Sequence, residues 1–323
     1  YLHPAREAAE REIVVAVHFA EEELEQRQQA VASALARAGL DALLCFRQES
    51  MYWLSGFDTF GYCFFQCLVI DADGGMTLLT REPDRRQAEH TSVLHDIRVW
   101  VDREGANPAE DLRGLLEHRG LRGRRLGIEY EAYGLTGRNA RRLDAALADF
   151  ADTEDASELV SRLRAIKSPS EMACIRRAAG LADDALDAAL QRVGPAAWEG
   201  DILADMQGAV FRGGGDYPGN EFIIGSGRDA LLCRYFSGRR SLDERDQLTL
   251  EWAGVYRRYH AAMMRTLLVG RADAEHRRMH AAAADAMAAC VEACSPGSTM
   301  GAVFDAHARV IDEAGLRPHR LNA

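Results

Sequence analysis

The chain has 323 residues, of which 47% are hydrophobic and 28% charged, as in a soluble globular protein of about two domains. A formal net charge of -11 disfavours contact with a phosphate backbone, so we expect no nucleic-acid partner. No apolar run reaches the roughly 18 residues of a membrane span, and no signal-peptide pattern is present. The seven cysteines are scattered and suggest no disulfide framework, so we expect a cytoplasmic protein with reduced thiols and no membrane contact.

The first part of the chain alternates helical and strand patterns. Apolar residues recur with a helical period over residues 21–38, and Gly39 follows as a typical C-terminal cap. Shorter apolar runs typical of strands, and two further helices, follow along the chain. The strands are expected at residues 40–46, at two places within 66–80 around a turn at Asp73 and Gly74, at 97–102 and at 124–130, and the helices at 109–118 and 139–148. This order predicts an α/β domain with a mixed sheet over residues 1–155.

A second domain is expected over residues 156–323. Ser168, Pro169 and Glu171 supply an N-cap, a proline in the first turn and an acidic first turn, so a long helix should begin there. The remaining pattern predicts helices at residues 198–212, 272–293 and 300–314, and strands at 221–227, 247–256 and, as the return strand of a hairpin, within 256–270.

Three segments carry a resemblance to a known superfamily: RAIKSPSEMACIRRAA, GGGDYPGNEFIIGSGRDALLCRY and LEWAGVYRRYHAAMMRT. In order and spacing they resemble the pita-bread superfamily of methionine aminopeptidases, prolidases, Xaa-Pro aminopeptidases and creatinases. The upstream segment SMYWLSGFDTFGYCFFQCLVI looks like the smaller domain of the prolidase and creatinase branch. The resemblance implies an α/β (α+β) protein that forms a homodimer, with a creatinase-like N-terminal domain and a pita-bread catalytic domain. Because a later histidine and two glutamates complete the site in relatives, we expect the catalytic domain to be incomplete at Ala323.

The segment LEWAGVYRRYHAAMMRT bears on metal binding. In metal-dependent relatives, two aspartates on facing strands hold a pair of divalent ions, which bind the substrate carbonyl and generate hydroxide near neutral pH. Glu251 takes the first of these positions and Ala262 the second. An alanine has no lone pair to offer, so the usual dinuclear centre is not expected. If a divalent metal such as Mn, Co, Fe or Zn is bound, Glu251 is its candidate ligand.

Creatinase-like and ectoine-hydrolase-like members offer a second pattern. They keep the fold without the metal ligands and hydrolyse a C–N bond with an ordered water and a histidine as acid or base. The resemblance implies that His260 transfers the proton and that Glu251 orients His260 or the water, with no cofactor. Arg234 stands where most relatives have a substrate-contacting histidine, and its guanidinium suits a substrate carboxylate.

Further substrate contacts are suggested at five positions. Tyr259 stands beside His260, where creatinase has a substrate-contacting tyrosine. Asn220 and Glu221 follow a glycine run that can bring the backbone close to a ligand. Tyr62 and Phe64 fall where creatinase-like dimers reach into a neighbour's pocket.

Structural roles remain open for the same residues. His260 can be a histidine near a turn whose hydrogen bonds are all made within the protein. The glycine run can be a flexible connection, and Tyr62 and Phe64 can be two core aromatics in an apolar strand. Glu251 can belong to a buried ion pair with Arg234, Arg257 or Arg265.

Three functions therefore follow from the sequence. The first is hydrolysis of a C–N bond, of amide or amidine type, in a small substrate that carries a carboxylate. The second is a metal-dependent Xaa-Pro dipeptidase or aminopeptidase that uses Glu251 with ligands beyond Ala323. The third is a catalytically inactive pseudo-enzyme that binds a small ligand or a peptide.

Overall fold

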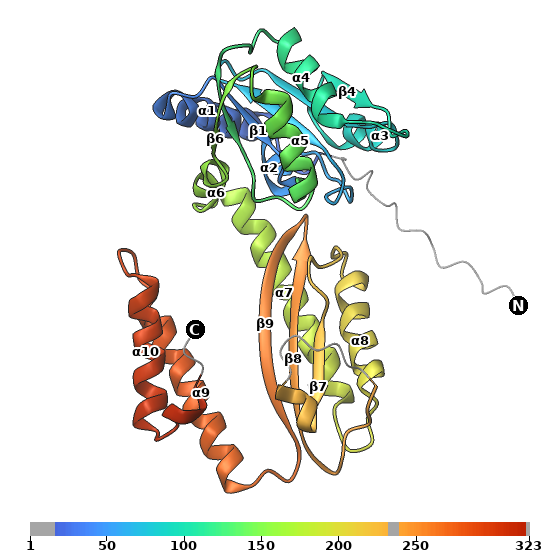
Figure 1. The fold of residues 1–323 in the computed structure, drawn as a ribbon. Helices are drawn as coiled ribbons and strands as arrows, with labels where there is room; N and C mark the ends of the chain where they lie inside the picture. Colours follow the sequence, from blue (N-terminus) through green and yellow to red (C-terminus); the bar gives the residue numbers. More distant parts are fainter. Residues whose placement is uncertain (1–16, 232–238, 321–323) are drawn as a thin grey trace, which may run out of the picture. The chain divides into compact units, whose positions relative to one another are not determined.

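A computed structural model describes residues 17–231 and 239–320 (Figure 1). The chain divides into two compact units, Tyr1–Ser170 and Glu171–Ala323. Helix α6 (Glu158–Arg164) belongs to the first unit, because Val160 is fully buried in its core. The boundary expected from the sequence, at residue 156, lies just before this helix.

The N-terminal unit contains a six-stranded sheet in the order β4-β3-β2-β1-β5-β6. β2 pairs antiparallel with β1 and β3, whereas β1–β5, β3–β4 and β5–β6 are parallel pairs, so the predicted mixed sheet is confirmed. The strands are β1 (Ala42–Cys45), β2 (Cys67–Asp71), β3 (Met76–Arg81), β4 (Ile97–Trp100), β5 (Arg125–Ile128) and β6 (Asp152–Asp155).

Helices cover both faces of this sheet. One core cluster contains apolar residues of α1, α2, α3 and α6, and a second contains apolar residues of α4 and α5. Leu43 and Leu44 of β1 are fully buried in different clusters, because neighbouring side chains of a strand point to opposite faces. The helices that precede α6 are α1 (Glu21–Ala38), α2 (Gln48–Ser55), α3 (Glu82–Thr91), α4 (Pro108–His118) and α5 (Gly137–Leu147).

Some elements of this unit have no clear pattern in the sequence. Helix α2 is buried from Ser50 to Ser55, so it shows no amphipathic period. Strand β6 is an edge strand of four exposed residues, Asp152–Asp155, and lacks an apolar face. Tyr62 and Phe64, expected in an apolar strand, lie instead between α2 and β2 and are 39% and 41% exposed, so the alternative that both are core residues is wrong.

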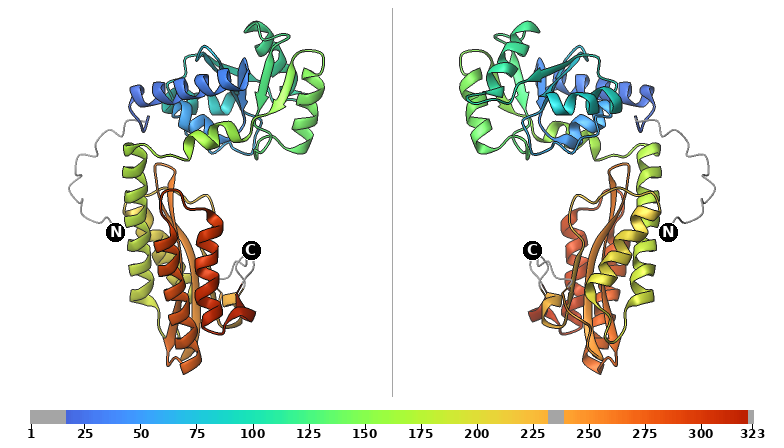
Figure 2. Two further views of the ribbon diagram at one scale, coloured as in Figure 1. Left: turned by 90° about the vertical axis from the view of Figure 1, so that its left-hand side faces the viewer. Right: turned by 90° about the vertical axis from the view of Figure 1, so that its right-hand side faces the viewer.

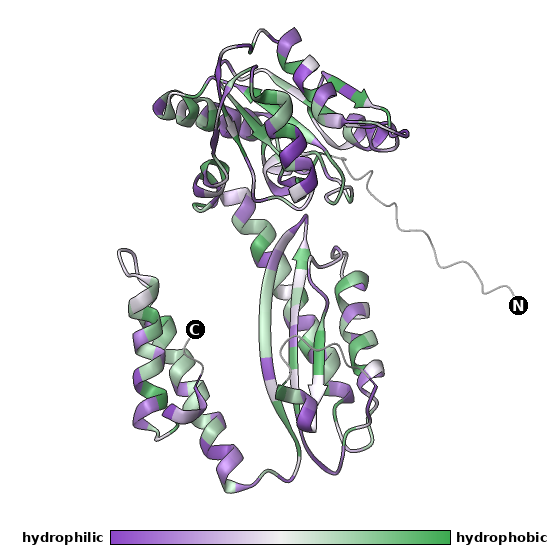
Figure 3. Ribbon diagram, viewed as in Figure 1, coloured by the Kyte–Doolittle hydropathy of each residue, from purple (hydrophilic) through white to green (hydrophobic). Residues whose placement is uncertain are grey.

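The C-terminal unit is built on a three-stranded antiparallel sheet in the order β7-β8-β9. Apolar residues of α7 and α8 pack on one face of this sheet (Figure 2), and the two helices and the strands carry green, hydrophobic segments between purple ones in Figure 3. The elements are α7 (Pro169–Arg192), α8 (Glu199–Arg212), β7 (Ile223–Ser226), β8 (Arg245–Tyr256), β9 (Tyr259–Gly270), α9 (Ala274–Ala293) and α10 (Met300–Glu313), with 3-10 turns at Gly227–Leu231 and Arg317–His319.

Strand β8 lies very close to helix α7. The indole N–H of Trp252 donates a hydrogen bond to the carbonyl oxygen of Ala182 at 3.0 Å. A Cβ atom added at Gly254 would lie 2.0 Å from the carbonyl oxygen of Ala178, so only glycine allows this approach. The contact fixes which face of the hairpin is turned toward the helices.

Helices α9 and α10 pack against each other around Ala282, Ala286 and Ile311. In the part of the chain that the structure describes, no helix is long and apolar enough to cross a membrane.

Candidate functional site

The β8–β9 hairpin turns through only two residues. Arg257 and Arg258 have φ angles of 49° and 67°, so both occupy the left-handed region, as in a type I′ turn. Tyr256 pairs with Tyr259 directly beside the turn. This register decides the direction of every side chain on the return strand, including His260.

Glu251, His260 and Ala262 lie on the same face of the hairpin, opposite to α7 and α8. Residues that pair directly across two antiparallel strands share a face, and faces alternate along each strand. The pairs on this face are Glu251 with Met264, Ala253 with Ala262 and Val255 with His260. Met264 is 50% exposed, so solvent reaches the row that contains Glu251. We call this surface the open face.

His260 makes two hydrogen bonds at the turn end of the open face. Its Nε2 atom accepts from the backbone N–H of Gly219 at 2.9 Å, and its Nδ1 atom lies 2.9 Å from the carbonyl oxygen of Arg258. Since Nε2 is an acceptor, the ring is neutral with its proton on Nδ1, which donates to Arg258. The backbone partners of His260 were not foreseen from the sequence, because nothing in YPGN signals contact with a residue 41 positions later.

Glu251 lies farther along the same face and is half-buried. Among the residues that the structure describes, its carboxylate has no hydrogen bond or ion pair. Arg265 pairs with Leu250 and so lies on the opposite face, while the guanidinium of Arg257 lies over the ring of Tyr256. Met264, the cross-strand partner of Glu251, lies four positions after His260, which corresponds to about 13 Å at the usual rise of a strand. The structure therefore does not bring Glu251 and His260 into contact.

Tyr259 points to the other face of the hairpin. Its hydroxyl donates a hydrogen bond to Oε1 of Glu171, a buried residue of α7, at 2.8 Å. Asn220 and Glu221 are exposed and directly follow Gly219, so they lie near His260 in the chain fold. Among the candidates in this unit, Asn220 and Glu221 therefore lie near His260. The side chain of Tyr259 lies on the opposite face.

The other candidates lie elsewhere. Tyr62 and Phe64 belong to the N-terminal unit, where the ring of Tyr62 packs edge-on against that of Tyr133 at 6.0 Å. The guanidinium of Arg81 lies 3.3 Å from the ring centre of Phe64. Arg234 lies outside the described residues.

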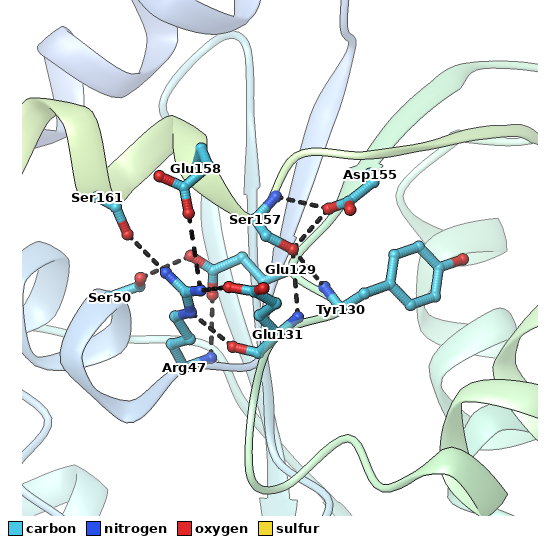
Figure 4. Close-up of polar contacts among 9 residues, drawn as sticks. All are labelled: Arg47, Ser50, Glu129, Tyr130, Glu131, Asp155, Ser157, Glu158 and Ser161. Carbon is cyan, nitrogen blue, oxygen red and sulfur yellow. Dashed lines mark hydrogen bonds and ion pairs between the residues drawn. The ribbon is translucent and has the colours of Figure 1, made fainter. Parts of the chain in front are cut away.

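A buried carboxyl group in the N-terminal unit escaped the sequence analysis. Glu129 is fully buried, and its Oε2 atom accepts from the backbone N–H groups of Phe46 and Arg47 at 3.0 and 2.9 Å. Its Oε1 atom accepts from the hydroxyl of Ser50 at 2.6 Å (Figure 4). Burial raises its pKa to about 7, although these hydrogen bonds and the nearby Arg47 lower it. The only signal in the sequence was a glutamate at the end of the apolar run LGIEY.

The open face offers few metal ligands. Within residues 17–231 and 239–320, no group of three or more His, Cys, Asp and Glu side chains could hold a metal ion. Ala262 lies diagonally across from Glu251, where a second carboxylate could have shared an ion with it. The described residues therefore do not fit a dinuclear centre of the usual type.

Comparison with known proteins identifies the family. Residues 27–166 match the Creatinase/Prolidase N-terminal domain, and residues 173–322 match Metallopeptidase family M24. The chain belongs to the creatinase/prolidase superfamily. The resemblance inferred from the three sequence segments is confirmed, and the protein is a hydrolase of the M24 family.

Several members of the creatinase/prolidase superfamily match along most of the chain. An ectoine hydrolase of Halomonas elongata is 28% identical over an alignment of 329 residues, which covers 94% of this chain and 80% of that protein. An Xaa-Pro dipeptidase of Pyrococcus horikoshii is 23% identical over 280 residues, which covers 85% of this chain and 73% of the relative.

Solved structures from the superfamily share the fold. A dipeptidase from Pyrococcus horikoshii superimposes with a TM-score of 0.78 at 21% identity, covering 92% of this chain and 80% of that one. An Xaa-Pro dipeptidase from Bacillus anthracis also gives 0.78, at 20% identity, with 91% and 79% covered. The expected pita-bread fold is confirmed by these likenesses.

Proposed function

We propose that this hydrolase cleaves a C–N bond, of amide or amidine type, in a small substrate that carries a carboxylate. The observation that carries the proposal is the set of side chains on the open face: His260 and Glu251 share it, Glu251 has no ion pair among the described residues, and a methyl group stands at Ala262. The similarity to an ectoine hydrolase supports the same chemistry, because ectoine is a cyclic amidine with a carboxylate.

His260 is the proposed proton carrier. Its Nε2 atom accepts a hydrogen bond from the backbone N–H of Gly219. If a bound substrate breaks this hydrogen bond, the Nε2 lone pair can accept a proton from water. The water oxygen then bonds to the substrate carbon, the C–N bond breaks, and the same proton passes to the departing nitrogen. Since Glu251 is too far away to orient His260, we assign it to a cationic part of the substrate or to a metal ion.

Activity assays on the intact chain test this proposal. Ectoine, creatine and Xaa-Pro dipeptides should be compared with metal-stripped protein and with added Mn, Co, Fe or Zn. The expected result is ring opening of ectoine, which exposes a new amino group, or release of an amine from creatine. Either activity should be lost in His260→Ala and retained after metal removal. His260→Gln is the matched variant, since it keeps a hydrogen-bond acceptor but cannot carry the proton.

A metal-dependent Xaa-Pro dipeptidase is the second candidate. It is favoured by the half-buried carboxylate of Glu251, which has no ion pair in the described part of the chain, and by the dipeptidase relatives. Activity on Xaa-Pro dipeptides that requires added metal and disappears in Glu251→Gln would replace the first proposal. Ala262→Asp, which restores a second carboxylate, should then strengthen metal binding measured by calorimetry.

A pseudo-enzyme is the remaining outcome. Binding of these compounds without turnover by the intact chain, with or without metal, would favour it over both hydrolases.

The expected homodimer and the substrate contacts at Asn220, Glu221 and Arg234 are further parts of the proposal. Light scattering tests the dimer, and Arg234→Met should raise KM for a substrate with a carboxylate.

A further inference from the structure

The N-terminal unit contains a pocket of about 610 Å³ whose lining residues all belong to this unit. It is lined at one side by the first residues of α2 and at the other by the loop that follows β5. The residues that line this pocket include two arginines, a glutamate and two tyrosines that a ligand could contact or that shape the wall: Arg47, Arg164, Glu49, Tyr62 and Tyr133. These residues are dispersed over the first half of the chain.

Arg47 holds the pocket together and has little capacity left for a ligand. Its Nε atom donates to the carbonyl oxygen of Glu131 at 2.6 Å, and its Nη2 atom donates to the carboxylate of the same residue at 2.7 Å. Its Nη1 atom donates to the hydroxyl of Ser161 at 2.6 Å (Figure 4). The side chain of Arg47 is only 17% exposed. It therefore ties α6 to the loop after β5.

Arg164 is positioned by this contact. It lies three residues after Ser161 on α6, so both side chains are on one face of the helix. Arg164 is half-buried, and among the described residues its guanidinium has no hydrogen bond or ion pair. A half-buried guanidinium that lines a pocket without a partner is suited to a carboxylate.

Glu49 brings the opposite charge to the same pocket. It is the second residue of α2, and its carboxylate likewise has no hydrogen bond or ion pair among the residues described. Although Glu49 and Arg164 line one pocket, they form no ion pair with each other. The pocket therefore presents a separated positive and negative group, which a ligand with both charges can satisfy.

Two tyrosines form an aromatic wall. The rings of Tyr62 and Tyr133 pack edge to face with their centres 6.0 Å apart. A Cβ atom at Gly134 would lie 2.5 Å from the carbonyl oxygen of Phe64, so the two loops that carry the tyrosines are in close backbone contact. Tyr133 is 83% exposed, and its ring offers apolar surface to a ligand.

We propose that this pocket binds a small zwitterion with an apolar or aromatic side chain, of the class of a free amino acid. The ligand carboxylate pairs with Arg164 and its ammonium group with Glu49. Its side chain packs against Tyr62 and Tyr133. Every residue of the pocket belongs to the N-terminal unit, whereas the proposed hydrolytic residues His260 and Glu251 belong to the C-terminal unit.

Calorimetry on the intact chain with three related probes tests the two charge contacts. L-phenylalanine carries both charges, 3-phenylpropionate lacks the ammonium group, and 2-phenylethylamine lacks the carboxylate. None contains an amide or amidine bond for the enzyme to cleave. L-phenylalanine should bind about tenfold more tightly than either analogue, because each analogue loses one charge-assisted contact.

Variants assign each contact. Arg164→Gln should weaken binding of L-phenylalanine and 3-phenylpropionate but leave that of 2-phenylethylamine unchanged. Glu49→Gln should weaken binding of L-phenylalanine and 2-phenylethylamine but leave that of 3-phenylpropionate unchanged. Tyr133→Ala should weaken all three probes. Arg162→Gln is the matched control, since Arg162 is an exposed arginine of the same helix and does not line the pocket.

Hydrogen exchange locates the bound probe. L-phenylalanine should slow exchange in peptides that cover residues 46–50 and 130–135. Equal affinities for the three probes, absence of binding by L-phenylalanine, or slowed exchange only in peptides of β8 and β9 would each overturn the proposal.

Discussion

Replacing Glu129 with glutamine is predicted to flatten the pH dependence of stability in the N-terminal unit. The buried carboxyl group has a pKa raised from 4.5 to about 7, mainly by burial. Between these values the folded protein holds a proton that the unfolded chain has released. The stability of the wild-type protein should therefore fall as pH rises through this window.

The size of the effect follows from the same shift. A rise from 4.5 to about 7, at about 1.4 kcal/mol for each pH unit, corresponds to a loss of about 3 kcal/mol between pH 4.5 and pH 8. Glutamine has nearly the same shape and cannot ionise. Its amide oxygen can accept from the N–H groups of Phe46 and Arg47, and its NH₂ group can donate to Ser50, so all three contacts are retained.

The measurement must report on the N-terminal unit alone, because a chain with two units need not unfold in one step. We suggest urea unfolding at pH 5 and pH 8, followed by hydrogen exchange in peptides of β1 and β5. The difference in unfolding free energy between the two pH values should be about 2 to 3 kcal/mol larger in the wild type than in Glu129→Gln.

Glu25→Gln is the matched control for the loss of one negative charge from a chain with a net charge of -11. Glu25 is exposed on α1, so its replacement should leave the pH profile parallel to that of the wild type. If Glu129→Gln also gave a parallel profile, the carboxyl would be ionised throughout, and the argument from burial would be refuted.

Three variants test the packing of the C-terminal unit. Gly254→Ala should destabilise this unit by about 3 kcal/mol or more, because its Cβ atom would lie 2.0 Å from the carbonyl oxygen of Ala178. Gly180→Ala, in α7 with no atom within 4 Å of the new Cβ, should instead stabilise it by about 0.5–1 kcal/mol in thermal unfolding. Tyr259→Phe removes the hydrogen bond to Glu171 and should cost about 1 kcal/mol of stability with KM unchanged; a raised KM with unchanged stability would restore Tyr259 as a substrate contact.

Most secondary structure could be predicted because its signals are local. The helical period of α1, the proline and glutamate at the start of α7, and the apolar runs of the central strands each depend on a few neighbouring residues. Helix α2 and strand β6 gave no such signal. The first is buried from Ser50 to Ser55, and the second is an exposed edge strand of acidic residues and threonine.

The sequence by itself determined the superfamily and the α/β architecture, and it predicted that Ala262 replaces a carboxylate. Only the tertiary structure decided which candidates share a surface. The hairpin turns at Arg257 and Arg258, which lack the usual turn chemistry of Asn-Gly or Asp-Gly. A turn displaced by one residue would have moved His260 to the helix side and Tyr259 to the open face, because side chains alternate along a strand.

The buried state of Glu129 and the pocket around Arg164 were likewise decided by tertiary structure. Glu129 is recognised by residues 79 to 83 positions earlier, and Arg164 reaches its place through Ser161 and Arg47, which are 114 positions apart. Burial and the absence of a charge partner depend on segments distant in the chain. Periodicity and spacing describe only neighbours, so these two features required the folded arrangement.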